Sequence, residues 1–427
     1  MAQSDISTLS INTIRLLSAD AVQAANSGHP GMPMGMAPVA YVLWTKIMNY
    51  DPDAPQWPNR DRFILSAGHG SMLLYSILHL TGYDLSLDEL KNFRQLGSKT
   101  PGHPEFHLEF GVETTTGPLG QGFSNGIGMA LAAKHLGAVF NKEDVSIVDP
   151  TIYAIASDGD LMEGISHEAA SLAGHLGLDN IIYVYDDNHI SIEGDTDLAY
   201  SDNVQQRFES YGWHVQTVDD ANDVESLEYA FKNAKSVTGQ PHLISVRSHI
   251  GYGSPNQVDT SGVHGSPLGE DELRLTKENL GFDPDKKFVI PDEVKEHFKS
   301  AVEERQKAHK EWGSRLTEYK EKYPEDAKEL ERRLSGEKRT LNDDDLPVFK
   351  PEDGNIASRK ASGKVIQSVA KQIPELIGGS ADLAPSTKTL IDDSGDFAKG
   401  YYRERNLHFG VREHAMGGIL NGMSLYR

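Results

Sequence analysis

The chain has 427 residues and a formal net charge of −22, and it contains no cysteine. This charge argues against a nucleic-acid partner, because no basic face would offset repulsion from phosphates. The lack of cysteine excludes disulfides, thiolate nucleophiles and cysteine-ligated metal sites. No apolar run is long enough for a signal core or a membrane span, so we expect a cytoplasmic protein without a membrane partner.

The spacing of apolar residues predicts an α/β fold with a parallel β-sheet flanked by helices. A helical stripe covers residues 5–27. Residues 152–157 and 181–185 are short apolar runs typical of buried strands, and a helix is expected between them at 162–177. A strand, a helix and a strand at this spacing form a βαβ unit, whose two strands are parallel. We expect a further strand at 242–247.

Composition divides the chain into three regions. Residues 1–315 are expected to form the first α/β domain, and residues 351–427 begin a second, incomplete α/β domain. Between them, residues 316–350 are rich in charged side chains and poor in apolar anchors, which favours a charged helical linker. In the second domain we expect one helix at 358–373 and another from Glu413 onward.

Two strand ends carry the most informative side chains. Asp158 comes directly after the strand 152–157, and Asn188 follows the strand 181–185. In a parallel sheet these positions lie side by side at the carboxyl edge, where open α/β sheets bind ligands. Carboxylate and amide oxygens suit Mg²⁺ or Ca²⁺, and a phosphate-bearing cofactor would supply further ligands. An Asp-Gly pair after one strand is more often a simple turn, so the metal hypothesis depends on the convergence of two strand ends.

Four histidines lie in loops rich in small residues, namely His29, His69, His103 and His264. A single loop histidine is usually a solvated surface group, so the interpretation depends on their number. Imidazole titrates near neutral pH and can pass protons at a sugar hydroxyl. The Gly-rich segment 116–122 is only a weak phosphate-loop signal, because it lacks the Gly-Lys-Ser/Thr of a Walker motif.

Together these motifs resemble the transketolase family of thiamine-diphosphate enzymes. The segment 156–164, read with 185–194, is similar to the cofactor motif of that family. Ser157 replaces the usual first Gly of the motif, and Asp160 stands where Cys or another small residue is expected. The similarity extends over the loops 27–36, 65–71, 102–104, 116–122 and 263–266, and over the segment 410–416.

By this resemblance, the chain has the thiamine-diphosphate-binding fold, and its cofactors are thiamine diphosphate and Mg²⁺, with Ca²⁺ or Mn²⁺ as substitutes. The implied reaction is that of the pentose phosphate pathway. It moves a two-carbon ketol unit from a ketose phosphate such as xylulose 5-phosphate to an aldose phosphate such as ribose 5-phosphate, by way of the thiamine ylid.

The resemblance also implies roles for individual residues. The implied metal ligands are Asp158, Asn188 and Ile190. The implied catalytic residues are Glu413, which hydrogen-bonds the aminopyrimidine ring, and His29 and His264, which assist proton transfer. Cofactor contacts are expected from His69, Gly117, Pro118, Leu119, Gly159, Asn188 and His264. Substrate contacts are expected from His29, His103, His264, Arg359 and Ser386.

The family pattern implies a homodimer whose active site lies at the subunit interface, with Glu413 facing the cofactor of the partner. It also includes a C-terminal domain that is absent here. We therefore expect a truncated form, or one of two polypeptides of a split enzyme, with little activity by itself. The alternatives are a sister enzyme such as dihydroxyacetone synthase or deoxyxylulose-phosphate synthase, and a fragment that only binds cofactor or dimerises. A histidine-metal hydrolase is disfavoured, because the sequence contains no His-Glu-x-x-His.

Overall fold

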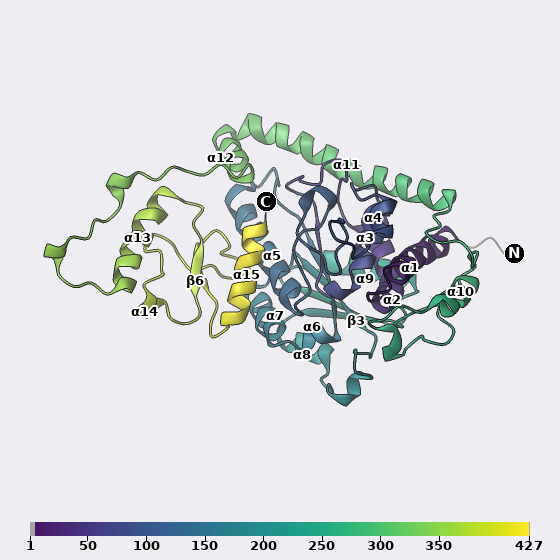
Figure 1. Ribbon diagram of the computed structural model, residues 1–427. Helices are drawn as coiled ribbons and strands as arrows, with labels where there is room; N and C mark the ends of the chain where they lie inside the picture. The colour runs from purple at the N-terminus through teal and green to yellow at the C-terminus, as the bar shows by residue number, and fades with distance from the viewer. Residues whose placement is uncertain (1–4, 427) are drawn as a thin grey trace.

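The centre of the molecule is a five-stranded sheet (Figure 1), seen in a computed structural model that describes residues 5–426. Its strands stand in the order β1-β2-β3-β5-β4, and each neighbouring pair is parallel. The predicted parallel sheet and its βαβ unit are therefore confirmed. The strands are β1 Arg62–Leu65, β2 Ile152–Ser157, β3 Ile181–Asp187, β4 His214–Val218 and β5 His242–Arg247.

Helices surround this sheet. In the main body they are α1 Ile6–Ala25, α2 Gly31–Val42, α3 Ser71–Leu80, α4 Leu87–Lys91, α5 Gln121–Phe140, α6 Asp158–Met162, α7 Gly164–Leu176, α8 Val204–Ser210, α9 Val224–Ser236, α10 Glu270–Asn279, α11 Asp292–Lys322 and α12 Pro324–Leu334. The helix expected at 162–177 corresponds to α7, which begins at Gly164 because Glu163 has extended backbone angles, and the short helix α6 precedes it.

The two faces of the sheet are covered by different helices. Successive side chains of a strand point to opposite faces, and β2 follows this rule. Tyr153 and Ile155 join the apolar cluster formed with α1, α2, α3 and α9. Ile152 and Ala154 join the cluster formed with α5 and α7. The sheet is thus buried on both sides, which is why its strands read as continuous apolar runs in the sequence.

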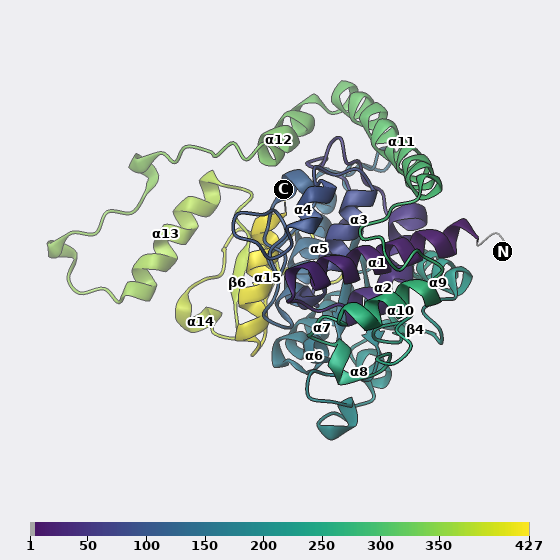
Figure 2. The same ribbon diagram turned by 45° about the vertical axis from the view of Figure 1, so that its right-hand side comes forward.

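The long helix α11 runs along the outside of the body (Figures 1 and 2), although its sequence is highly charged. It is anchored by a few large side chains, among them Trp312 and Tyr319, which are buried. The Trp312 indole donates a hydrogen bond to the carbonyl of Ile147 at 2.9 Å. The predicted boundary at residue 315 falls within this unbroken helix, and the division of the chain into three regions stays a prediction.

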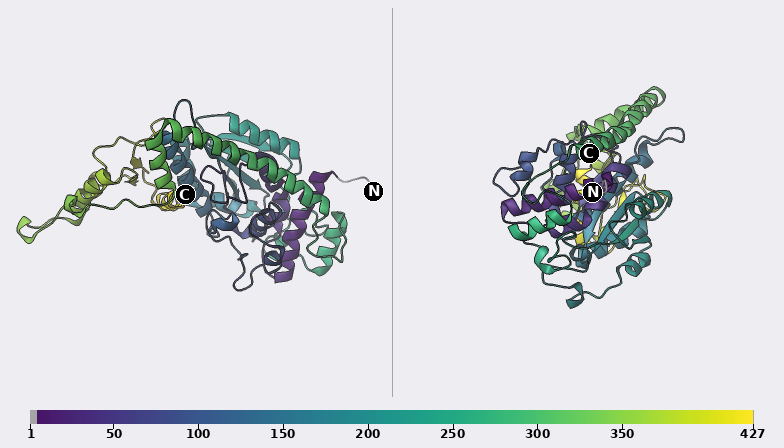
Figure 3. Two further views of the ribbon diagram at one scale, coloured as in Figure 1. Left: turned by 90° about the horizontal axis from the view of Figure 1, so that it is seen from above. Right: turned by 90° about the vertical axis from the view of Figure 1, so that its right-hand side faces the viewer.

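The C-terminal unit projects from the body (Figure 3) and contains a second, small parallel sheet. Its elements are α13 Ser358–Gln372, β6 Gly378–Ser380, α14 Ala384–Thr387, β7 Asn406–His408 and α15 Glu413–Leu425. The expected incomplete second α/β domain is confirmed. Eight of the fourteen large apolar side chains that are exposed in the described part of the chain lie between 348 and 420. This unit therefore leaves much apolar surface uncovered.

Helix α15 joins this unit to the body by packing directly against α5. The contact is so close that side chains would not fit. A Cβ on Gly128 of α5 would lie 2.0 Å from the carbonyl oxygen of Ile419, and a Cβ on Gly422 of α15 would lie 1.8 Å from that of Asn125. The first residue of α5 also reaches α15, because Gln121 Nε2 lies 3.0 Å from His414 Nε2. The two helices thus meet backbone to backbone along their length.

Among residues 5–426, no helix is both long enough and apolar enough to cross a membrane.

We predict that Gly128→Ala loosens α15 from α5. The added methyl group overlaps the Ile419 carbonyl, and overpacking of this kind costs about 1–3 kcal/mol. The melting temperature should fall, and limited proteolysis should release the C-terminal unit sooner. The matched control is Gly417→Ala on the exposed side of α15, where no described atom lies within 4 Å of the added Cβ. That change should be neutral or stabilise the helix by about 0.5–1 kcal/mol. Equal losses for both variants would contradict the prediction.

Candidate functional site

The ends of β2 and β3 lie side by side at the carboxyl edge of the sheet. In the register of these strands, Ser157 is paired with Asp186. Asp158 therefore begins the turn that leaves β2, and Asn188 begins the turn that leaves β3. Both side chains are buried, each with 4 % of its surface exposed. The structure brings the two predicted metal donors to neighbouring strand ends, as the sequence indicates.

The carboxylate of Asp158 is only half satisfied. The hydroxyl of Tyr185 donates a hydrogen bond to Asp158 Oδ1. In the described structure, Asp158 Oδ2 is buried and has no hydrogen-bond partner. Burial raises the pKa of Asp158 to about 7, and the nearby charges of Asp186 and Asp187 add to this effect. A bound cation would stabilise the ionised form and give Oδ2 a partner.

Asn188 is held by the strand that precedes it. Its Nδ2 donates to Asp186 Oδ2 at 2.9 Å, and its Oδ1 accepts from the backbone N–H of Ile190 at 2.9 Å. An ionised carboxylate can only accept hydrogen bonds, so Asp186 orients the NH₂ group toward itself and the amide oxygen away. The chain turns at His189, where φ is 65°, before it reaches Ile190.

Across residues 5–426, no three His, Asp or Glu side chains form a cluster that could hold a metal ion. The donor set expected from the sequence is of another kind, in which Asp158 supplies the one carboxylate. An amide oxygen from Asn188 and a main-chain carbonyl from Ile190 would complete the protein's share. Such an all-oxygen set is the kind that Mg²⁺ and Ca²⁺ prefer.

Asp160 is fully buried and connects three segments of the site. Its Oδ1 accepts from Ser66 Oγ at 2.7 Å and from the backbone N–H of Gly120 at 2.8 Å. Its Oδ2 accepts from the backbone N–H and the hydroxyl of Ser157. At position 160 the sequence motif predicts Cys or another small residue, and a carboxylate that faced a diphosphate would repel it. The structure shows that Asp160 points into the protein, where it fastens the ends of β1 and β2 to the start of α5.

The predicted cofactor loops also meet at this edge. A Cβ added to Gly159 would lie 2.9 Å from Leu119 Cδ1, so the turn after β2 touches the loop before α5. A Cβ on Gly117 would lie 3.2 Å from the His103 ring, and Gly117 has a φ of 142° that suits glycine alone. Pro118, between these residues, is exposed. Gly117 and Leu119 of the loop before α5 therefore lie close to the turn that contains Gly159, at the carboxyl edge of the sheet.

Three of the four predicted histidines form a tight group, and His103 lies at its edge. The ring centroids of His69 and His264 are 5.1 Å apart, and those of His29 and His69 are 5.2 Å apart. His29 lies 5.8 Å from His264 and 6.4 Å from His103. Burial lowers the pKa of His29 to about 4 and also lowers the pKa values of His69 and His264. These imidazoles are therefore neutral at pH 7 and able to accept a proton.

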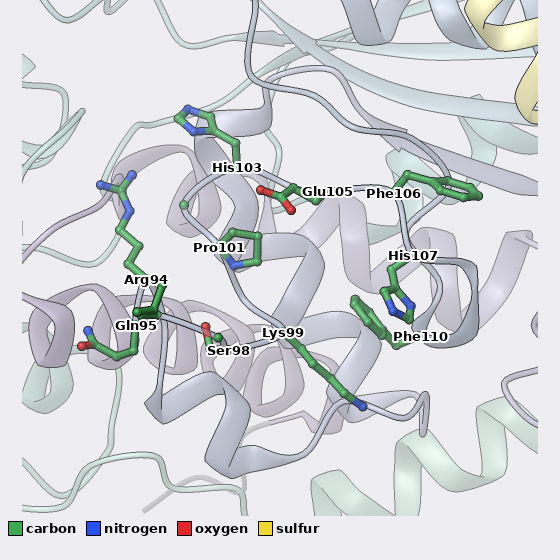
Figure 4. Close-up of a pocket in the computed structure, with 13 residues that line it drawn as sticks. Arg94, Gln95, Ser98, Lys99, Pro101, His103, Glu105, Phe106, His107 and Phe110 are labelled. Atoms are coloured by element: carbon green, nitrogen blue, oxygen red, sulfur yellow. The ribbon is translucent and has the colours of Figure 1, made fainter.

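Arg94 belongs to this site, although no pattern in the sequence predicts it. Its guanidinium donates to Ser27 Oγ at 2.8 Å and lies 3.4 Å from His29 Nδ1. Arg94 and His103 both line an open pocket of about 860 Å³ (Figure 4). A positive charge at this mouth suits an anionic ligand that approaches the histidines.

Three predicted site residues lie elsewhere. Arg359 is at the start of α13, Ser386 is in α14 and Glu413 begins α15, and all three are exposed. The helices α13 and α14 project away from α2 and α3, whereas α15 packs on α5 at the edge of the body (Figure 1). Within the single chain, the structure does not bring them together with the histidine group.

We predict that Asp158→Asn stabilises the protein at alkaline pH. The pKa of Asp158 is raised in the folded chain, so its contribution to stability is present near pH 4 and is lost as the pH rises through about 7. An amide does not ionise, so the variant keeps its stability as the pH rises. Its free energy of unfolding should exceed that of the parent by about 1–3 kcal/mol at pH 8 and hardly at all at pH 4. Urea unfolding at both pH values, without divalent cation or cofactor, measures this difference.

The contrasting variant is Asp160→Asn. This buried carboxyl has four hydrogen-bond donors around it, and an amide NH₂ in its place would face N–H or O–H groups. We expect a loss of about 1–3 kcal/mol, the typical cost of leaving buried polar groups unpaired. A stabilised Asp160→Asn, or an Asp158→Asn that is equally destabilised at both pH values, would contradict this account of the two carboxyls.

Comparison with known proteins identifies relatives of the whole chain. Residues 6–339 match the family model described as transketolase, thiamine diphosphate binding domain. Residues 354–427 match that described as transketolase, pyrimidine binding domain. The transketolase of Nostoc sp. is 54 % identical over 428 aligned residues, covering 100 % of this chain and 64 % of the relative. The transketolase of Bacillus subtilis is 54 % identical, covering 98 % of this chain and 62 % of the relative.

A solved structure gives the same result. The transketolase of Pichia stipitis in complex with sedoheptulose 7-phosphate matches with a TM-score of 0.95 and 48 % identity. The match covers 99 % of this chain and 63 % of that chain. The chain therefore spans less than two thirds of the length of each of these three relatives.

Proposed function

Because the chain belongs to the transketolase family, we propose that it binds thiamine diphosphate through a divalent cation and serves ketol transfer between sugar phosphates in the pentose phosphate pathway. The observation that carries the proposal is the buried, unpartnered Asp158 Oδ2 at the strand edge beside Asn188, close to Gly159 and Leu119. We place the reaction in the cytoplasm, with xylulose 5-phosphate as donor and ribose 5-phosphate as acceptor.

The residues present suit Mg²⁺ as the cation. Asp158 Oδ2, Asn188 Oδ1 and the carbonyl of Ile190 are three oxygen donors, two of them from buried side chains. Mg²⁺ usually takes one or two carboxylates from a protein and the rest of its ligands from phosphate and water. The diphosphate would then sit where Gly159, the first turn of α6 and the loop 117–119 leave room for it.

When bound, thiamine diphosphate supplies the electron sink that accepts and releases the two-carbon unit. The chain's own residues bind and orient it. Gly117 lets the backbone approach closely, Leu119 offers an apolar side chain for a ring, and His69 offers a neutral imidazole. Glu413 would hold a proton at a ring nitrogen of the aminopyrimidine, for which a carboxyl is suited when it is buried on binding.

The proposed proton transfers use the histidine group. His29 and His264 are neutral at pH 7, so either can take the proton of a sugar hydroxyl as a carbon–carbon bond breaks and return it later. His103, at the edge of the group, would contact the sugar at the pocket mouth. Arg359 can hold a phosphate with its fork of N–H donors, and Ser386 can add a hydroxyl donor.

We further propose that the complete site needs two copies of the chain. Glu413, Arg359 and Ser386 are exposed and belong to helices of the C-terminal unit. A second copy can present this unit to the histidine group, which makes a homodimer with sites at the interface. The division into a diphosphate domain (1–315), a linker (316–350) and a pyrimidine domain (351–427) is part of the same proposal.

A titration tests the cofactor proposal. Thiamine diphosphate added to the purified chain should bind in the presence of Mg²⁺ and at least tenfold more weakly after chelation, because Asp158 and Asn188 would hold the cation that offsets the negative charge of the diphosphate. Calorimetry measures the affinity, and a coupled assay with the two pentose phosphates measures turnover. Binding that is indifferent to Mg²⁺ would end the proposal.

Mixing two inactive variants tests the shared site. His69→Ala damages the cofactor side and Glu413→Gln damages the C-terminal side. In a mixed dimer, one site keeps an intact His69 from one copy and an intact Glu413 from the other, so mixing should restore up to about a quarter of the parental signal if copies pair at random. Cofactor bound per chain and ketol transfer are both measured. A mixture no better than the average of the two variants would contradict a site built from two copies.

The second candidate function is that of a chain that binds cofactor and dimerises but transfers little ketol. The titration and the turnover assay separate the two, because this candidate predicts binding without normal turnover. A comparison of acceptor aldehydes separates ketol transfer to sugar phosphates from dihydroxyacetone synthesis.

A further inference from the structure

We propose that Tyr185 is a positioning residue that holds Asp158 so that Oδ2 faces the metal. This inference rests on the proposed cation site and concerns a side chain that the sequence motif contains without assigning it a task. Tyr185 lies on β3, one strand away from Asp158, and its hydroxyl donates to Asp158 Oδ1. One oxygen of the carboxylate is thereby taken by the protein and the other is left for a ligand.

The side chain of Tyr185 is held in place by the strand that carries it and by its packing. β3 is an inner strand of the sheet, and Tyr185 is paired in register with Ala156 on β2 and with Ser245 on β5. Only 4 % of its surface is exposed, and the ring belongs to the apolar cluster between the sheet, α5 and α7. A ring packed in this way cannot follow a moving carboxylate, so the bond restrains the rotation of Asp158.

The restraint matters because of the geometry that Mg²⁺ requires. Mg²⁺ demands near-ideal octahedral coordination at short distances, whereas Ca²⁺ accepts six to eight oxygens in flexible arrangements. A carboxylate free to rotate can bind with both oxygens, which suits Ca²⁺. A carboxylate with Oδ1 held by Tyr185 offers a single oxygen, which suits Mg²⁺. Tyr185 would therefore favour the smaller ion and give Asp158 its orientation.

The chain offers a matched control two residues earlier. Tyr183 lies on the same strand and in the same apolar cluster, and it is fully buried. Its hydroxyl donates to the carbonyl of Phe123 at 2.9 Å and does not touch Asp158. Tyr183→Phe and Tyr185→Phe remove the same atom from the same core. Any common effect of the two changes reports on stability, and the difference between them reports on Asp158.

The experiment measures Mg²⁺-dependent and Ca²⁺-dependent binding of thiamine diphosphate by the parent and the two variants, together with their melting temperatures. For Tyr185→Phe we expect about 10-fold to 100-fold weaker Mg²⁺ binding, the usual effect of losing a partner of a metal ligand. The loss for Ca²⁺ should be several-fold smaller. Tyr183→Phe should bind both ions like the parent, whatever its melting temperature.

Each outcome has a distinct meaning. The positioning role is overturned if Tyr185→Phe keeps the parental affinities. It is also overturned if the affinities measured with Mg²⁺ and with Ca²⁺ fall equally and both variants show the same fall in melting temperature. In either case the cofactor proposal stands. If the parent itself shows no cation-dependent binding, the proposed function fails before Tyr185 is tested. Weaker binding with a shifted Mg²⁺ to Ca²⁺ preference in Tyr185→Phe alone supports the inference.

Discussion

The structure depends on the parallel pairing of β2 with β3, which sets the turns after the two strands next to one another. Each strand is buried on both faces, so a polar side chain cannot sit within it without cost and the first ones occur where it ends. Asp158 and Asn188 occupy these ends. A slip of one residue in the register would separate the donors and turn the apolar side chains of β3 to the wrong faces. The same pairing therefore defines the core and the site.

The three buried carboxyls near this edge differ in their hydrogen-bond partners. Asp160 is surrounded by donors and fastens neighbouring segments. Asp186 is satisfied by Ser248 and Asn188, and it orients the amide. Asp158 keeps one oxygen without a partner in the described structure, and burial raises its pKa to about 7. Of these three carboxyls, only Asp158 keeps an oxygen without a hydrogen-bond partner among the described residues. A single unsatisfied group of this kind is typical of a binding site.

Much of this could be predicted from the sequence, because the signals are local. The apolar runs of β2, β3 and β5 and the polar residues after the first two are contiguous, and they indicated the sheet and the metal donors. The task of Asp160 could not be foreseen, since its partners Ser66 and Gly120 are remote in sequence. Arg94 was missed for the same reason. The distance of Glu413 from the histidines within one chain also needed the structure, and the roles of the individual site residues remain predictions.

The close contact between α5 and α15 bears on how the active sites of a dimer would be connected. α5 begins directly after the loop 117–120, and α15 begins at Glu413, with Gln121 and His414 touching where the two helices start. At Gly128 and Gly422 the two helices approach so closely that a methyl group would overlap a carbonyl of the other helix, so this contact has little freedom to rearrange. In a dimer, this contact would hold the loop 117–120 of one active site at a fixed distance from the Glu413 that serves the other. A displacement of the loop in one site would then be carried mechanically to the acidic residue that serves the other.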